Sequence, residues 1–256
     1  MFSNIIEIII LSIVQGISEF LPISSSAHLN IVEIIFEFNS NSLMIDVSLH
    51  LGSLLAIVFY FRRELLDLRN NQKLLSLLII GSIPIVIAGY VISSTGLVNL
   101  LENNLKIIAW TTLIFGIILY LADKSKFDKK ISSNLNFKTI LYIGLFQILA
   151  LIPGVSRAGI TITAARLFRF NRFDSSKISF LLAIPAIAGA SVLQLKNAIG
   201  QSFELNYLIL ISITLSFLFS YFTVKFFLDY INKFSLNVFV IYRIIISIIL
   251  FIIIYN

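Results

Sequence analysis

Two short polar segments interrupt an otherwise apolar chain and resemble each other. Residues 15–28 read Gln-Gly-Ile-Ser-Glu-Phe-Leu-Pro-Ile-Ser-Ser-Ser-Ala-His, and residues 147–161 read Gln-Ile-Leu-Ala-Leu-Ile-Pro-Gly-Val-Ser-Arg-Ala-Gly-Ile-Thr. Each has a Gln followed by Pro-x-x-Ser, which matches Ser25 with Ser156, 131 residues further on. Ionisable residues in apolar surroundings are functional candidates, and a repeated pair of broken polar segments is typical of a central site in a membrane protein.

The Pro-x-x-Ser segments predict the N-termini of two helices. Proline breaks one helix and suits the first turn of the next, and a following serine can cap it. The two capped helices would run toward residues 37 and 168. Helix N-termini favour anions, so two of them at one site suit a diphosphate, although a simple cap is the alternative. The residues expected to bind the phosphates are Ser24, Ser26, Gly154, Ser156 and Thr161.

Charged and amide side chains lie beside these serines. Arg157 falls in the first turn of the second helix, and arginine binds phosphate with two parallel hydrogen bonds. Glu19 could ligate a divalent cation, act as a general base or pair with Arg157. Gln15 is four residues before Glu19, on the same helical face, and could offer its carbonyl to a metal. Because Mg²⁺ commonly takes only one or two carboxylates plus phosphate oxygens, this small ligand set is sufficient.

His28 is three residues after Ser25, so both share one helical face. A serine with a histidine in reach is a nucleophile–base arrangement, in which Glu19 is the other candidate base. Direct attack by His28 and attack by a metal-bound water are the alternatives. Asp46 and His50, four apart on the next apolar run, either support the site or lie at the outer interface. Arg243 either joins the site or extends to the cytoplasmic end.

The composition indicates a helical membrane protein. The 256-residue chain is 58% apolar and only 12% charged, against about 25% charge in soluble domains. The formal charge of +6 lies mostly in loops, so it indicates topology and lipid contact, not nucleic-acid binding. There are no cysteines, which excludes thiol chemistry. No cleavable signal is expected. We predict one membrane domain over residues 1–256, built from half-repeats 1–122 and 123–256, as a monomer or homodimer.

Six apolar runs are long enough to span a bilayer. Residues 5–38 and 139–168 are also apolar but are interrupted, and each divides into two shorter pieces. Such pieces suit re-entrant helix–loop–helix hairpins, which are tolerated where protein covers the loop. The expected fold is therefore all-α, with spans near 43–61, 74–92, 105–122, 178–195, 207–226 and 237–255.

Loop charge orients the spans. The positive-inside bias places loops 62–73, 123–138 and 166–177 in the cytoplasm, and loops 93–104 and 196–206 outside. The word Leu-Leu-Ala-Ile occurs in both the first and the fourth span, which run in opposite directions. This predicts an inverted repeat in which the two hairpins enter from opposite faces and their tips meet near the midplane.

These motifs resemble those of the bacterial undecaprenyl-diphosphate phosphatases, the bacitracin-resistance family. The resemblance rests on Gln15-x-x-x-Glu19, on Phe20-Leu-Pro-Ile-Ser-Ser-Ser-Ala-His28, and on Pro-Gly-Val-Ser-Arg-x-x-x-Thr ending at Thr161. It extends from about residue 5 to the C-terminus. The family pattern permits either Glu or Gln at position 15. Many members carry Gln at position 50, where this chain has His.

The resemblance implies a phosphatase of the bacterial cytoplasmic (inner) membrane that converts undecaprenyl diphosphate into undecaprenyl phosphate, the lipid carrier for cell-wall synthesis. It implies a divalent cation, Mg²⁺ or Ca²⁺, and a site facing the outer side. Its functional residues fall on Glu19, Ser25, His28, Ser156, Arg157 and Thr161. A transporter or flippase for a phosphorylated lipid or small anion is the competing interpretation, because inverted repeats with broken helices also build transporters.

Overall fold

A computed structural model describes residues 2–36, 43–95, 104–198 and 207–255. The loops expected at 93–104 and 196–206 lie largely outside these residues. The regular secondary structure of the described part is α-helical, apart from one 3-10 helix and an isolated bridge between Lys129 and Phe170. The helices outside the two interrupted segments are α3 (Leu43–Tyr60), α4 (Arg62–Asp67), α5 (Gln72–Thr95), α7 (Leu105–Asp123), α8 (Ile131–Asn134), α11 (Arg172–Ala198), α12 (Tyr207–Ile231) and α13 (Asn237–Tyr255).

Six of these helices are long and apolar enough to cross a membrane, which confirms the six expected spans. They are α3, α5, α7, α11, α12 and α13. Helix α11 begins at Arg172, six residues before the expected span at 178, because its first turns are polar but still helical. The apolar run therefore marks the membrane part of this helix and not its start.

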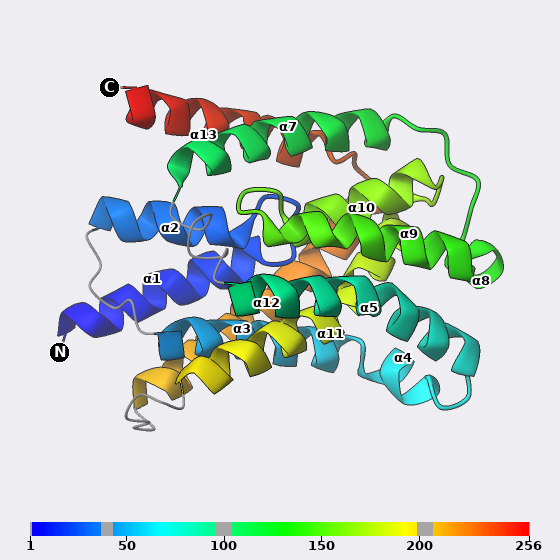
Figure 1. Ribbon diagram of the computed structural model, residues 1–256, viewed down its shortest axis with the longest axis horizontal. Helices are drawn as coiled ribbons and strands as arrows, with labels where there is room; N and C mark the ends of the chain where they lie inside the picture. Colours follow the sequence, from blue (N-terminus) through cyan, green and yellow to red (C-terminus); the bar gives the residue numbers. More distant parts are fainter. Residues whose placement is uncertain (1, 37–42, 96–103, 199–206, 256) are drawn as a thin grey trace.

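Each interrupted segment forms two helices joined near the middle of the molecule. The first comprises α1 (Phe2–Ser18) and α2 (Ser25–Phe36), and the second comprises α9 (Phe137–Gln147), η1 (Ile148–Leu151) and α10 (Arg157–Leu167). In Figure 1, α1 and α2 extend to the left from their junction, whereas α9 and α10 extend to the right. The re-entrant course through a bilayer and the inverted repeat remain predictions.

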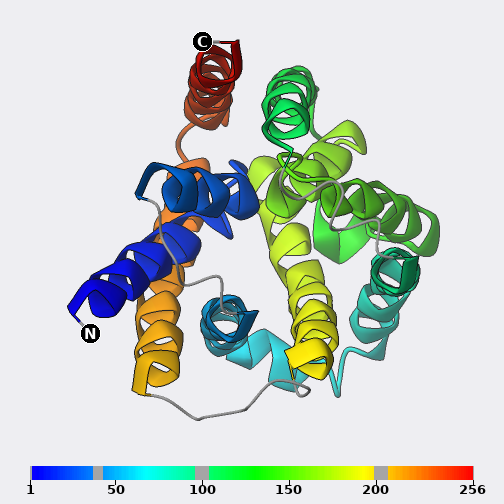
Figure 2. The same cartoon turned by 60° about the vertical axis from the view of Figure 1, so that its left-hand side comes forward.

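Both halves of the chain place three long helices after an interrupted pair. Helix α3 packs against α12, α7 against α13, and α5 against α9. Helix α11 contacts α3, α5 and α10, and Figure 2 shows it between the α3 side and the α5 side. This arrangement gathers the junctions of both interrupted pairs around one central helix.

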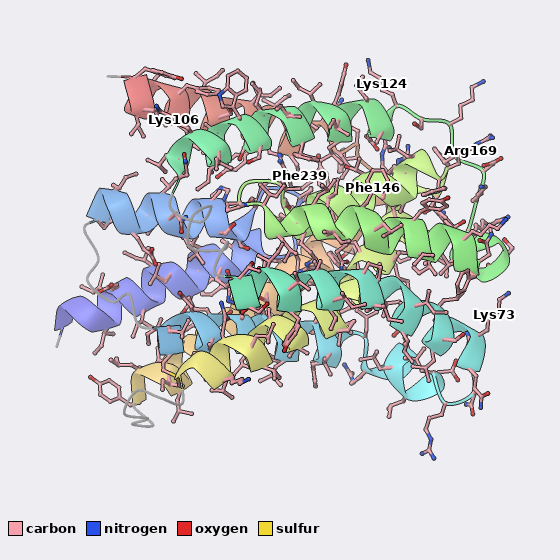
Figure 3. The ribbon with its side chains drawn as sticks, in the orientation of Figure 1. Lys73, Lys106, Lys124, Phe146, Arg169 and Phe239 are labelled. Carbon is pink, nitrogen blue, oxygen red and sulfur yellow. The ribbon has the colours of Figure 1, made fainter. Side chains whose placement is uncertain are left out.

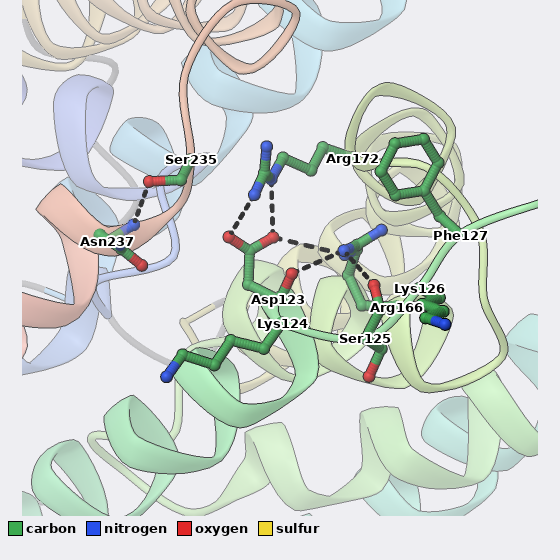
Figure 4. A pocket seen from close by; sticks show the side chains of 9 residues that line it. All are labelled: Asp123, Lys124, Ser125, Lys126, Phe127, Arg166, Arg172, Ser235 and Asn237. Atoms are coloured by element: carbon green, nitrogen blue, oxygen red, sulfur yellow. Dashed lines mark hydrogen bonds and ion pairs between the residues drawn. The ribbon is translucent and has the colours of Figure 1, made fainter.

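One end of the molecule carries most of the basic side chains. Figure 3 shows Lys73, Lys124 and Arg169 toward that end. At this end the buried carboxylate of Asp123 accepts two hydrogen bonds from Arg172, at 2.8 and 3.0 Å, and lies 3.4 Å from Nε of Arg166 (Figure 4). This ion cluster joins the end of α7 to α10 and α11. The positive-inside bias predicts that this end is cytoplasmic, and the orientation stays a prediction.

Candidate functional site

The two interrupted pairs meet through an ion pair. Arg157 Nη2, at the start of α10, lies 2.7 Å from Glu19 Oε1, in the loop after α1. The second carboxylate oxygen, Oε2, accepts hydrogen bonds from Ser25 Oγ at 2.7 Å and from Gln15 Nε2 at 3.1 Å. Glu19 and Gln15 are both buried. The structure thus brings four of the expected site residues into one hydrogen-bonded group, and the ion pair anticipated from sequence is present.

The loop backbone has the same unusual turn in both pairs. Ser24 has a φ of 78° and Ser156 a φ of 71°, and each directly precedes the first residue of a helix. Positive φ is costly for residues other than glycine, and such residues cluster at functional sites. Ser156 also caps α10, because its Oγ accepts from the Gly159 N–H at 3.1 Å.

This turn corrects the sequence alignment by one residue. The prolines aligned Ser25 with Ser156, whereas the backbone places Ser24 in the position of Ser156. Gln15 and Gln147 are separated by the same 132 residues, so the shifted alignment needs no gap. Ser25 is therefore the counterpart of Arg157, and each is the first residue of its helix.

Arg243 of α13 donates hydrogen bonds to the backbone of both loops. Its guanidinium, which is 1% exposed, donates to Pro22 O of the first loop at 3.2 Å. It also donates to Val155 O and Gly154 O of the second loop, at 3.0 and 2.9 Å. Further bonds reach carbonyls of α7. Arg243 therefore does not extend to the cytoplasmic end, which was one of the two interpretations of its position.

Gly154 permits this close packing. Its φ is 84°, and a Cβ there would lie 2.2 Å from Thr111 Oγ1 on α7. A side chain would therefore clash with α7 as well as strain the backbone. The structure thus assigns Gly154 a role in seating the second loop against α7, with its carbonyl turned to Arg243.

The ion pair lies on the wall of a cavity of about 220 Å³. One part of the lining is polar and comprises Glu19, Ser24, Ser25, Ser26, His50, Ser156 and Arg157. The other part is apolar and comes from α5, from the end of η1 with the residue after it, and from α11, through Ile85, Ala150, Leu151, Ile152, Ala186, Ile187 and Ala190. Arg157 Nη1 is buried without a hydrogen-bond partner among the described residues. An unpaired guanidinium nitrogen beside a cavity is suited to an anionic ligand.

Two expected site residues, His28 and Thr161, do not line the cavity. His28 Nδ1 lies 2.6 Å from Ser24 O, and Nε2 lies 2.7 Å from the hydroxyl of Tyr242 on α13. Thr161 is fully buried, and its Oγ1 donates a hydrogen bond to the backbone carbonyl of Arg157 at 2.8 Å. The same Oγ1 lies 2.6 Å from Ser179 Oγ on α11. Neither side chain lines the cavity. Helical spacing put His28 on the face of Ser25, but the structure shows no bond between these two side chains, and spacing could not give the partners that other helices supply.

Sequence reasoning left His50 and the apolar wall unassigned. His50 lines the cavity from α3, although its spacing from Asp46 was equally suited to the outer interface. The apolar wall gave no signal, because alanines and isoleucines are common throughout the chain. The available hint was the group of small residues, Ala186, Ala188, Gly189 and Ala190, on α11.

The site offers a small set of ligands for a cation. Gln15 Oε1 is buried and has no hydrogen-bond partner among the described residues, and its Nε2 contacts Glu19. An unpaired amide oxygen beside a carboxylate suits a hard cation that takes its other ligands from phosphate and water. Within the described ranges, no group of three or more His, Cys, Asp or Glu side chains has metal-binding geometry. Gln15 and Glu19 therefore fit a cation only if a substrate completes its coordination.

Comparison with known proteins identifies the family of this chain. The model of the family "Bacitracin resistance protein BacA" matches residues 8–249. An undecaprenyl-diphosphatase of Elusimicrobium minutum is 39% identical, over 96% of this chain and 97% of its own length. Undecaprenyl-diphosphatase 3 of Bacillus cereus is 38% identical, over 93% of each chain. The chain therefore belongs to the bacitracin resistance protein BacA family.

Proposed function

We propose that this protein hydrolyses undecaprenyl diphosphate to undecaprenyl phosphate and inorganic phosphate. The observation that carries the proposal is the contact of Ser25, Glu19 and Arg157 across two loops, in a cavity whose remaining wall is apolar. A diphosphate needs cationic and N–H partners, and a polyprenyl chain needs apolar ones. The relatives named undecaprenyl-diphosphatase match nearly the full length of the chain, which supports the same substrate.

The hydrogen bond from Ser25 supports this residue as the nucleophile. Its Oγ donates to Glu19 Oε2 at 2.7 Å, so the carboxylate is placed to take the proton as Oγ attacks the terminal phosphorus. His28 is the poorer nucleophile and the poorer base, because both of its ring nitrogens already have partners. Attack on phosphorus by Ser25 would give a phosphoserine and release undecaprenyl phosphate.

Arg157 and the two helix N-termini supply the positive field for the phosphates. The free Nη1 of Arg157 binds a phosphate oxygen, while Nη2 keeps its ion pair with Glu19. The N–H groups at the starts of α2 and α10 add partial positive charge at the same cavity. We further propose that Gln15 and Glu19 hold Mg²⁺ or Ca²⁺. Such an ion would neutralise the developing charge on the phosphoryl oxygens.

The apolar wall suits the lipid chain of the substrate. Ile85 of α5 and Ala190 of α11 line the cavity opposite the polar loops, and Ala190 is exposed at the surface. The first isoprene units would lie along this wall and the remainder in the surrounding lipid. Because a bulky side chain would narrow the wall, Ala190→Trp should raise KM at least tenfold for undecaprenyl diphosphate. It should change KM less for a short prenyl diphosphate, measured with the same purified protein.

The position of the cavity along the helices supports a site on the outer side of the bacterial cytoplasmic membrane. His50 is seven residues from the first residue of α3 and ten from its last, which the two arginines at the start of α4 follow. Ala190 is eight residues from the outer end of α11 and eighteen from its start. Because the chain has no cysteines, this topology can be tested with single Cys variants. Lys106→Cys should react with an impermeant thiol reagent from outside, whereas Asn71→Cys and Ser132→Cys should not.

Phosphate release by the purified protein in detergent tests the function. Undecaprenyl diphosphate should yield one phosphate per lipid, and Ser25→Ala should release less than a hundredth of the wild-type amount at equal protein concentration. A transporter for phosphorylated lipids would release no phosphate in detergent, because detergent leaves no membrane to cross. Absence of phosphate release by wild-type protein, with or without divalent cation, would reject the proposal.

A further inference from the structure

His50 is a cavity residue without a role in the mechanism above. It reaches the cavity from α3, a helix that contributes to neither loop. Its Nδ1 lies 2.9 Å from the backbone carbonyl of Asp46, one turn earlier. Because a carbonyl can only accept, Nδ1 must carry the hydrogen, and Nε2 of the neutral ring keeps its lone pair. No hydrogen bond to Nε2 is found from the described ranges of the chain.

The two histidines of the chain differ in this respect. His28 and His50 both bond through Nδ1 to the carbonyl four residues earlier. Nε2 of His28 then meets the Tyr242 hydroxyl at 2.7 Å, on the side of α13, whereas His50 lines the cavity. Only His50 therefore presents an imidazole to the space that the substrate would fill.

The second half of the reaction needs a base that Glu19 cannot provide. In the first half, Glu19 takes the proton of Ser25 as the serine attacks phosphorus. In the second half, water must attack the phosphoserine, and Ser25 Oγ leaves. Glu19 then returns its proton to Oγ, by the reverse of the first path. Because Glu19 is protonated at that moment, the proton of the attacking water must go to another group.

We propose that His50 is this second base. In the step, water oxygen bonds to phosphorus and the bond from phosphorus to Ser25 Oγ breaks. The water proton moves to His50 Nε2, while Oγ takes the proton held by Glu19, and inorganic phosphate leaves. The imidazolium then loses its proton to solvent, which restores neutral His50 and ionised Glu19. This inference rests on the proposed function and on Ser25 as the nucleophile.

The charged groups near His50 come from its own helix and from the elements that face it. Asp46 on the same helix and Glu19 across the cavity both interact electrostatically with His50, and Glu33 of α2 interacts with Asp46 and with Glu7 of α1. The opposing charge on the cavity wall is Arg157, which Glu19 neutralises. The other charged residues of the neighbouring helices lie toward helix ends, namely Arg172, Asp174, Lys177 and Lys196 of α11 and Lys225 and Asp229 of α12.

The test is His50→Gln in the full-length protein in detergent, with undecaprenyl diphosphate labelled in its terminal phosphate. Glutamine can orient the water but cannot take its proton, so hydrolysis should slow and not stop. We expect kcat to fall at least tenfold, within the roughly 10²–10⁴-fold range of general base catalysis. Rapid quenching should show labelled Ser25 accumulating in the variant.

A second variant separates base catalysis from structure. His50→Ala should lose activity similarly, and added imidazole should restore phosphate release, which a structural role would not predict. Glu19→Gln is the matched contrast, because it should prevent labelling of Ser25 altogether.

The outcomes separate the two proposals. Wild-type kcat in both His50 variants, slow turnover without labelled Ser25, or no response to imidazole would each overturn the role of His50 while leaving the hydrolase function standing. Failure of the wild-type protein to release phosphate would instead reject the function itself.

Discussion

Ser24 and Ser156 occupy the same place in the two interrupted helix pairs, yet the residues around them differ. After the shared turn, the first pair continues with Ser25 and the second with Arg157. Five residues before the turn, the first pair has Glu19, and the second has Leu151. The first loop therefore carries a carboxylate and a hydroxyl, and the second carries the guanidinium of Arg157.

This difference shows that neither loop is a site by itself. The first loop alone would hold an uncompensated carboxylate in apolar surroundings, and the second an uncompensated guanidinium, each of which is costly. The ion pair at 2.7 Å removes both costs only when the loops meet. The backbone turn is thus common to both pairs, whereas the chemistry depends on the different side chains that the two loops carry.

The largest effect should come from removing the charge of the first loop. Glu19→Gln keeps the size of the side chain but loses the proton acceptor of Ser25 and the partner of Arg157. We expect kcat to fall at least 10³-fold, about 4 kcal/mol of transition-state stabilisation, in a phosphate-release assay. Its dependence on divalent cation should flatten as well. Activity within tenfold of wild type would show that Glu19 is only a structural ion pair.

Replacing Arg157, the charged side chain of the second loop, should have a smaller effect. Arg157→Lys keeps the charge and can keep the ion pair with Glu19, but it loses the planar fork and the free Nη1. We expect at least a tenfold loss in kcat/KM, about 1.4 kcal/mol. The same assay over a range of substrate concentrations measures it. Normal turnover in the lysine variant would contradict a role for the free Nη1 of Arg157 in the transition state.

The sequence predicted the parts of this site that depend on local order. Helix periodicity, prolines and serine caps gave the spans and the starts of α2 and α10, and residue types gave Glu19 and Arg157 as partners. It did not predict the direction of His28, because Tyr242 belongs to α13 and is far away in the chain. Nor did it predict the register of the turn, since the prolines of the two loops differ in position by one residue relative to the positive φ.

The next prediction concerns Arg243, which donates hydrogen bonds to both loops. Arg243→Lys keeps one charge but cannot reach the carbonyls of Pro22, Gly154 and Val155 together, so some of them become unpaired. A buried unpaired group costs about 1–3 kcal/mol, so the thermal unfolding midpoint should fall. Activity should fall about fivefold through misplacement of the loops, about 1 kcal/mol. A variant with an unchanged midpoint and unchanged activity would show that the loops are held by other contacts.

The smallest effect should come from the two equivalent glutamines. Gln15 contacts Glu19, whereas both amide atoms of Gln147 are buried and have no hydrogen-bond partner among the described residues. Removing an unpaired buried amide is neutral or stabilising, so Gln147→Leu should leave phosphate release within twofold and should not lower the unfolding midpoint. Gln15→Leu is the matched change, and it should raise the divalent-cation concentration needed for half-maximal activity at least fivefold. If both leucine variants behave alike, the first loop holds no cation through Gln15, and the difference between the loops reduces to Glu19, Ser25 and Arg157.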